Sequence, residues 1–149
     1  MSIPVPGDAL ALAFDHVAFA VPDLEAAIAE YGKHLRLVVA HRERIEEQGV
    51  EEALLAVGGS FVQLLCPLGP ETPVGKFLTK RGPGIHHVGY RVASIEQALA
   101  AMKASGARLI DEKPRRGSRG TRIAFVHPAA LGGPLVELVE EPAEGSHHG

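Results

Sequence analysis

The sequence contains one short segment twice, and this repeat constrains the fold more than any other feature. Residues 14–21 read FDHVAFAV and residues 85–92 read IHHVGYRV, so that His16 and His87 each occupy the third position. After each copy, apolar side chains recur at the spacing of an amphipathic helix. An internal duplication of this kind predicts two halves with equivalent elements that bury a common core.

Both halves predict the element order β-α-β-β-β. In the first half the predicted strand, helix and three strands cover, in chain order, 14–21, 23–33, 36–46, 51–57 and 60–66. In the second half the predicted strand is followed by a helix between Ser94 and Gly106 and by three strands: 85–92, then 107–111, 121–127 and 134–140. Asp23 and Ser94 are the expected N-caps. A short helix is expected near 74–81, and the charged segment 112–120 is predicted to be a loop.

These elements predict an α+β fold in which two tandem β-α-β-β-β modules form a curved mixed sheet around a cleft. Such a cleft between duplicated modules is a natural ligand site, because both halves contribute side chains to it. A single domain is expected to begin after an N-terminal segment and to end before a disordered tail. The proposed boundaries are 1–13 for the segment, 14–67 for module one, 68–83 for a linker, 84–142 for module two and 143–149 for the tail.

Composition excludes several classes of function. The 149 residues carry a net charge of only −3, which gives no general attraction to nucleic acid or to an anionic membrane. The single cysteine excludes an intramolecular disulfide and a cysteine-based zinc site. The N-terminus lacks the features of a signal peptide, and no segment is long and apolar enough to span a membrane. A cytoplasmic protein is therefore expected.

Four polar side chains interrupt otherwise apolar strands at equivalent positions of the two halves. They are His16, Gln63, His87 and Glu137. A single strand histidine is more often a hydrogen-bonded core residue, but recurrence at matched positions favours a shared metal site. A buried carboxylate needs compensation, and two nitrogen and two oxygen donors suit Co, Ni, Mn, Fe or Zn. By strand alternation, His86 is expected on the opposite face from His87.

Two further groups of charged residues are candidates for chemistry or binding. Glu51 and Glu52 begin an apolar strand, and one of them must face inward; the pattern alone does not decide which one faces the cleft. Basic residues gather in the linker and in the charged loop, where either group could meet phosphates or a carboxylate. These residues are Lys76, Lys80, Arg81, Lys113, Arg115, Arg116, Arg119 and Arg122.

Several motifs together resemble the methylmalonyl-CoA epimerases of the vicinal oxygen chelate superfamily. They are Asp15-His16-Val17-Ala18, Glu47-Gln48-Gly49-Val50, Val62-Gln63-Leu64, Gly84-Ile85-His86-His87-Val88, Ile123-Ala124-Phe125-Val126-His127-Pro128 and Leu135-Val136-Glu137-Leu138. The resemblance implies the vicinal oxygen chelate fold, a homodimer, and a divalent ion, most often Co²⁺, with Mn²⁺, Ni²⁺ or Zn²⁺ as alternatives. The implied metal ligands are His16, Gln63, His87 and Glu137.

The resemblance also implies a reaction, the interconversion of (2R)- and (2S)-methylmalonyl-CoA by removal of the C2 proton through a metal-stabilised enolate. It favours Glu52 as one proton-transfer group, with Glu137 or a metal-held water as the other. The CoA phosphates are expected near Lys76 or near the loop that ends at Arg122. The alternatives are a glyoxalase I-type isomerase, an extradiol dioxygenase, which Gln63 as a fourth ligand disfavours, and a metal-free binding protein of the same superfamily.

Overall fold

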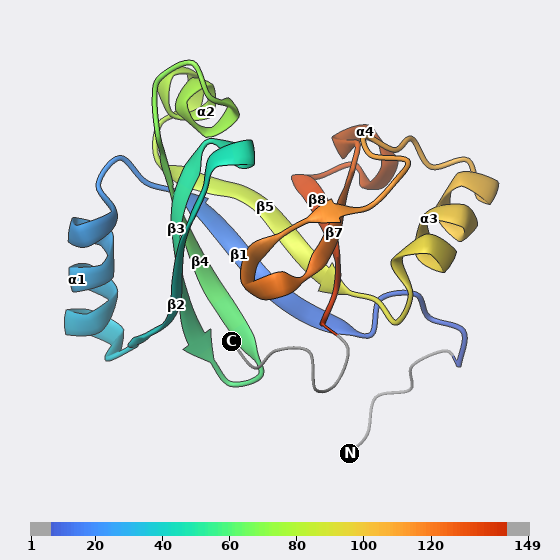
Figure 1. The fold of residues 1–149 in the computed structure, drawn as a ribbon, viewed down its shortest axis with the longest axis horizontal. Helices are drawn as coiled ribbons and strands as arrows, with labels where there is room; N and C mark the ends of the chain where they lie inside the picture. Colours follow the sequence, from blue (N-terminus) through green and yellow to red (C-terminus); the bar gives the residue numbers. More distant parts are fainter. Residues whose placement is uncertain (1–6, 143–149) are drawn as a thin grey trace.

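The computed structural model describes residues 7–142, and within this range one eight-stranded sheet organises the chain (Figure 1). Its strands are β1 (Ala13–Ala20), β2 (Val39–Ile45), β3 (Val50–Val57), β4 (Ser60–Pro67), β5 (Gly84–Arg91), β6 (Arg115–Arg116), β7 (Arg122–Val126) and β8 (Leu135–Glu140). The helices are α1 (Leu24–Leu35), α2 (Pro73–Arg81), α3 (Ile95–Ala104) and α4 (Pro128–Leu131), with 3₁₀ turns η1 (Glu46–Gln48) and η2 (Ser118–Gly120). The first six residues and the predicted tail 143–149 lie outside the described residues.

The strand order shows the duplication directly. From one edge to the other it is β2-β3-β4-β1-β5-β8-β7-β6, so each strand of the first half has its counterpart at the same distance from the centre. The two central strands, β1 and β5, pair antiparallel, whereas β1–β4 and β5–β8 are parallel. The histidine-bearing strands are therefore neighbours, and β4 and β8 flank them.

The two long helices cover the outer side of the sheet, one in each half (Figure 1). Helix α1 packs through Leu24 against Leu55 and Leu64 of β3 and β4, all three buried. Helix α3 packs its own apolar face against β7 and β8. Asp23 and Ser94 cap these helices by accepting backbone N–H groups, as predicted. Because side chains alternate along a strand, those that do not face α1 or α3 point to the opposite face of the sheet, which is its inner side.

Helix α2 closes one end of the inner side in the first half. Its Val74 packs among buried apolar residues that include Ala18 and Leu65. Thr72 caps the helix, and Pro73 occupies its first turn, which explains why this helix begins inside the connection between the halves. None of the described helices is long and apolar enough to cross a membrane.

The second half departs from prediction after α3. Instead of a strand at 107–111, a single bridge joins Leu109 to Val126. Beside this bridge the carboxylate of Asp111 accepts the Phe125 backbone N–H at 2.8 Å, a role that a backbone carbonyl would fill in a regular ladder. The edge strand forms later, as β6, inside the segment that was expected to be only a loop.

Candidate active site

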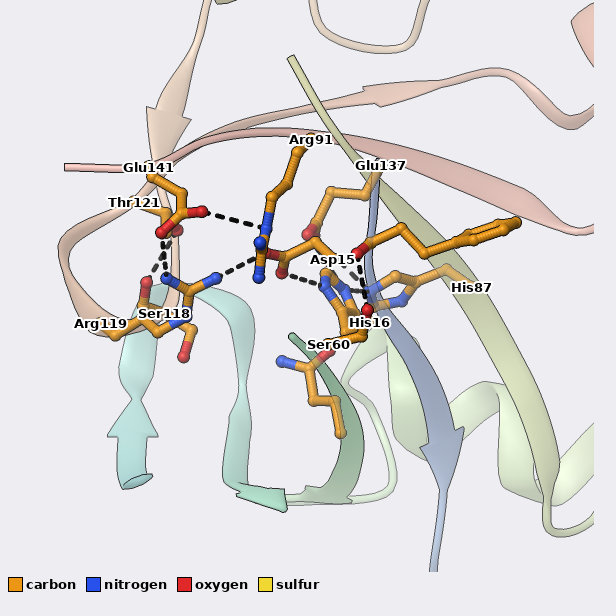
Figure 2. A network of polar contacts seen from close by, with 12 residues as sticks. Asp15, His16, Ser60, His87, Arg91, Ser118, Arg119, Thr121, Glu137 and Glu141 are labelled. Carbon is orange, nitrogen blue, oxygen red and sulfur yellow. Dashed lines mark hydrogen bonds and ion pairs between the residues drawn. The ribbon is translucent and has the colours of Figure 1, made fainter. Parts of the chain in front are cut away.

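Two imidazoles and one carboxylate meet at the centre of the inner side of the sheet (Figure 2). The Nε2 atoms of His16 and His87 are 2.9 Å apart. The carboxylate of Glu137 approaches both rings, with 3.2 Å from Oε1 to His16 Nε2 and 3.6 Å from Oε2 to His87 Nε2. All three side chains are buried, and their ligand atoms lie within 4.8 Å of one another. This trio could hold a metal ion.

Gln63 completes the set of four residues that the repeat singled out. Its Oε1 is buried and has no hydrogen-bond partner among the described residues, which is costly for an amide oxygen unless another group binds there. Gln63, the two histidines and Glu137 line one cavity of about 20 Å³, enough space for one water molecule or ion. Two imidazole nitrogens, an amide oxygen and a carboxylate suit a divalent cation, so the residues present fit a metal.

Glu52 faces this same cavity and is only 1% exposed. The Ser118 hydroxyl donates to its Oε2 at 2.6 Å, and Gln63 Nε2 donates to its Oε1 at 3.2 Å. Burial raises the pKa of Glu52, and these two hydrogen bonds offset that rise only in part. Glu51 instead lies at the surface, where it pairs with Arg42 at 3.0 Å. Of the two adjacent glutamates, the structure therefore brings Glu52 to the cavity.

The two central strands are irregular at equivalent positions, and each irregularity brings one more residue into contact with a histidine. The β1–β5 register shifts at Asp15 on one strand and at His86 on the other, so each strand contains a bulge directly before its histidine. Asp15 Oδ2 accepts from His16 Nδ1 at 2.7 Å, and the Nδ1 atoms of His86 and His87 are 2.9 Å apart. The expectation that His86 lies on the opposite face is wrong, because the bulge interrupts the alternation of side chains.

Charges around His16 favour a cation at this point. Burial by itself favours the neutral imidazole, but Asp15 and Glu137 raise the pKa of His16 to about 9. Burial likewise favours the neutral form of Asp15, yet hydrogen bonds from His16 and Arg91 and the charge of Arg119 hold its pKa well below the usual range. The two carboxylates next to His16 thus favour a positive charge at this position.

A larger cleft leads outward from the cavity. Next to His87 and Gln48 lies an apolar space of about 230 Å³, whose walls include Leu65 and Phe125. His86 and Leu135 also border a third space of about 440 Å³, lined by Lys76 and by the other basic residues of α2. By contrast, Arg122 forms ion pairs with Glu96 and Glu140 and lines none of these three spaces.

Sequence reasoning missed three residues around this site. Asp15 and Arg91 were not singled out, and Ser118 was treated only as part of a charged loop. The pairing of an acidic residue with the histidine that follows it was a usable signal for Asp15. For Ser118 no local signal exists, because its contact with Glu52 joins residues far apart in the sequence.

Comparisons with known proteins agree with this geometry. A family model for the Glyoxalase/Bleomycin resistance protein/Dioxygenase superfamily matches residues 15–125. An ethylmalonyl-CoA/methylmalonyl-CoA epimerase of Cereibacter sphaeroides is 39% identical over 126 residues, covering 83% of this chain and 94% of that protein.

Two solved structures are also similar. The crystal structure of methylmalonyl-CoA epimerase from Mycobacterium tuberculosis matches with a TM-score of 0.89 and 40% identity, over 94% of this chain and 95% of that chain. A methylmalonyl-CoA epimerase in complex with methylmalonyl-CoA and NH4+ matches with a TM-score of 0.86 and 39% identity, over 91% and 97% of the two chains. The predicted vicinal oxygen chelate fold is confirmed, and the chain belongs to the methylmalonyl-CoA epimerase family within this superfamily.

Proposed function

We propose that this chain is a metal-dependent epimerase that interconverts (2R)- and (2S)-methylmalonyl-CoA. The observation that carries the proposal is the approach of two carboxylates to one cavity from opposite halves of the sheet. Glu52 comes from β3 of the first half and Glu137 from β8 of the second, with the two histidine strands between them. Inversion of a carbon centre requires proton transfer on both of its faces, and two carboxylates that reach the cavity from opposite halves support this reaction.

Glu52 is the proposed base for one face. The C2 hydrogen of the substrate is acidified by the thioester and carboxylate on either side of it. A carboxylate whose pKa is raised by burial is a stronger base than a carboxylate in water, so Glu52 is suited to remove the C2 proton. Ser118 and Gln63 each donate a hydrogen bond to one oxygen of Glu52, which would fix the direction from which the proton is removed.

Glu137 is the proposed second acid–base group and also one of four residues that would hold a divalent cation. The others are His16, Gln63 and His87. When bound, such an ion would stabilise the negative charge that develops on the thioester oxygen as the C2 proton leaves. We propose Co²⁺ as the native ion on the basis of the resemblance to the methylmalonyl-CoA epimerases. The donor set of imidazole nitrogen and oxygen also suits Mn²⁺, Ni²⁺ and Zn²⁺.

The cleft gives the coenzyme part of the substrate a route to solvent. We place the acyl group where the small cavity meets the apolar space, beside His87 and Gln48, and the pantetheine arm along the apolar space beside Leu65 and Phe125. Lys76 then lies at the outer end, where a phosphate of CoA would meet basic side chains. The ion pairs of Arg122 leave it outside this route.

A homodimer also belongs to the proposal, and analytical ultracentrifugation of the purified protein tests it.

Exchange of the C2 hydrogen of methylmalonyl-CoA in deuterated water tests the reaction. Wild-type protein is expected to incorporate deuterium and invert the centre only when a divalent metal is present. Glu52→Gln is expected to retain the metal and lose inversion, whereas Glu137→Ala loses the metal itself. Glu51→Gln is the matched control, because this carboxylate pairs with Arg42 at the surface.

The outcomes separate the proposal from its alternatives. The absence of metal-dependent exchange would refute the epimerase assignment. Turnover of a glutathione hemithioacetal, without turnover of the CoA thioester, would indicate a glyoxalase I-type isomerase instead. Full activity of Glu52→Gln would remove Glu52 from the mechanism, and purified protein that binds no divalent metal would indicate a metal-free binding protein.

A further inference from the structure

Arg119 has a backbone conformation that is uncommon for a residue other than glycine. Its φ and ψ are 47° and 37°, in the left-handed region. Among the described residues, Arg36 is the other non-glycine residue with positive φ, but it ends α1 at the surface, where this conformation is ordinary. Arg119 instead lies inside the loop from Gly117 to Thr121. A left-handed conformation in such a loop persists only where surrounding contacts hold it.

Besides an ion pair with Glu141 of its own half at 3.6 Å, Arg119 has contacts from the other half of the chain. Its backbone N–H donates to Glu43 Oε1 of β2 at 3.1 Å. Its guanidinium carbon lies 4.9 Å from the centre of the Phe61 ring on β4. The side chain is only 18% exposed, and it lines the central cavity. The loop of the second module is thereby fixed across the first module.

The guanidinium reaches the residue that orients His16 (Figure 2). Arg119 Nη2 donates to Asp15 Oδ1 at 2.6 Å, and Arg91 Nε donates to the same oxygen at 2.8 Å. The other oxygen, Oδ2, accepts from His16 Nδ1 at 2.7 Å. Because Nδ1 of His16 donates here, its Nε2 is left to face His87 and Glu137.

We propose that Arg119 is a positioning residue that sets the orientation of His16 through Asp15 and so determines how tightly the site binds a divalent cation. This inference rests on the proposed function for its metal but makes a separate claim about one side chain. Arg91 lies on β5 next to Asp15 and cannot by itself fix the loop. Arg119 joins the loop to Asp15, so without it the carboxylate keeps only one arginine.

The same loop carries a second connection to the site. Ser118, the residue before Arg119, donates its hydroxyl hydrogen to Glu52 Oε2 at 2.6 Å. One short segment of the second half therefore contacts the orienting carboxylate of the metal site and the proposed base of the first half. Removal of the Arg119 side chain is expected to weaken metal binding and also to lower kcat, because the metal ligand His16 and the proposed base Glu52 both lose support from this loop.

The test is a Co²⁺ titration of metal-free wild-type protein, Arg119→Met and Arg119→Lys, followed by visible absorption and by calorimetry. Arg119→Met is expected to bind Co²⁺ about 10- to 100-fold more weakly, the usual effect of losing a partner that orients a metal ligand. Its absorption bands are expected to change, because the His16 ring is held less firmly. Arg119→Lys, which retains the charge, is expected to recover part of the affinity.

Arg36→Met is the matched control, because it removes another arginine with positive φ, one that is exposed at the end of α1 and does not line the cavity. Wild-type affinity is expected. Wild-type Co²⁺ affinity and spectrum in Arg119→Met would overturn the inference. If Arg119→Met does not fold, as judged by thermal unfolding, the affinity and spectrum of Arg119→Lys decide in the same way. Wild-type protein that binds Co²⁺ but does not exchange the C2 proton would refute only the proposed function.

Discussion

Replacement of Gly89 by alanine is the sharpest structural test of the proposed metal site. Gly89 lies on β5 opposite His16 of β1 and beside Glu137 of β8. A Cβ at this position would stand 2.3 Å from Cε1, 2.6 Å from Nδ1 and 2.9 Å from Nε2 of His16. The imidazole of His16 therefore lies directly over the glycine, and no side chain larger than hydrogen fits beneath it.

The required movement can be worked out from these distances. Ordinary contacts with a Cβ begin at 3.4 Å, so the ring would have to move by about 1 Å. The ring cannot move freely, because Asp15 binds its Nδ1 at 2.7 Å. Metal–ligand distances tolerate only about 0.2 Å, and the shift therefore removes His16 as a ligand. We expect Gly89→Ala to weaken metal binding by more than about 100-fold, beyond the effect of losing an orienting partner alone.

Metal content after purification and Co²⁺ affinity of the metal-free protein measure this effect. Gly84→Ala, at the start of the same strand, is the control, because a Cβ there meets nothing within 4 Å. The control is expected to bind Co²⁺ like the wild type, and thermal unfolding shows whether either variant loses its fold. Unchanged Co²⁺ affinity in a folded Gly89→Ala protein would refute the placement of His16 as a ligand.

Three other predictions follow from burial and charge. Burial raises the pKa of Glu52 above the usual carboxyl value of 4.5, so kcat/KM is expected to fall when the pH drops through this raised pKa. If kcat/KM stays constant down to pH 4.5, the assignment of Glu52 as the base is wrong. Ile95→Ala, at a fully buried position of α3, is expected to lower the free energy of unfolding by about 2–5 kcal/mol, as measured by urea denaturation. A loss below about 1 kcal/mol would contradict the packing of α3. Co²⁺ at about 100 times its Kd is expected to stabilise the wild type by about 2.7 kcal/mol in thermal unfolding but not Glu137→Ala; equal stabilisation of both would contradict Glu137 as a ligand.

The repeat made much of the fold and of the site predictable. Because the halves are equivalent, a polar residue such as Gln63 could be compared with Glu137 across the duplication, and both lie at the same cavity. The symmetric placing of the strands on the two sides of β1 and β5 follows from the same equivalence, although the sequence did not identify these two as the central strands. The choice between Glu51 and Glu52 did not, since the rest of their strand is apolar on both faces and alternation alone cannot say which face is the inner one.

The remaining features depend on geometry that short-range patterns do not encode. The bulges at Asp15 and His86 each add one residue to a central strand, so strict alternation assigns His86 to the wrong face. The position of Arg119 depends on a left-handed backbone angle and on contacts with the opposite half of the chain. Neither the angle nor those partners can be read from the loop's own sequence, which shows only a run of basic residues.

The two bulges have a consequence for the electronic character of the site. Each places a side chain against Nδ1 of the following histidine, but the first half supplies a carboxylate and the second an imidazole. An anionic partner makes its imidazole the stronger electron donor, so His16 would give more electron density to a bound ion than His87. The duplicated strands thus supply two nitrogen donors of unequal strength. The backbone around them is nearly symmetric, but the electric field at a bound ion would not be.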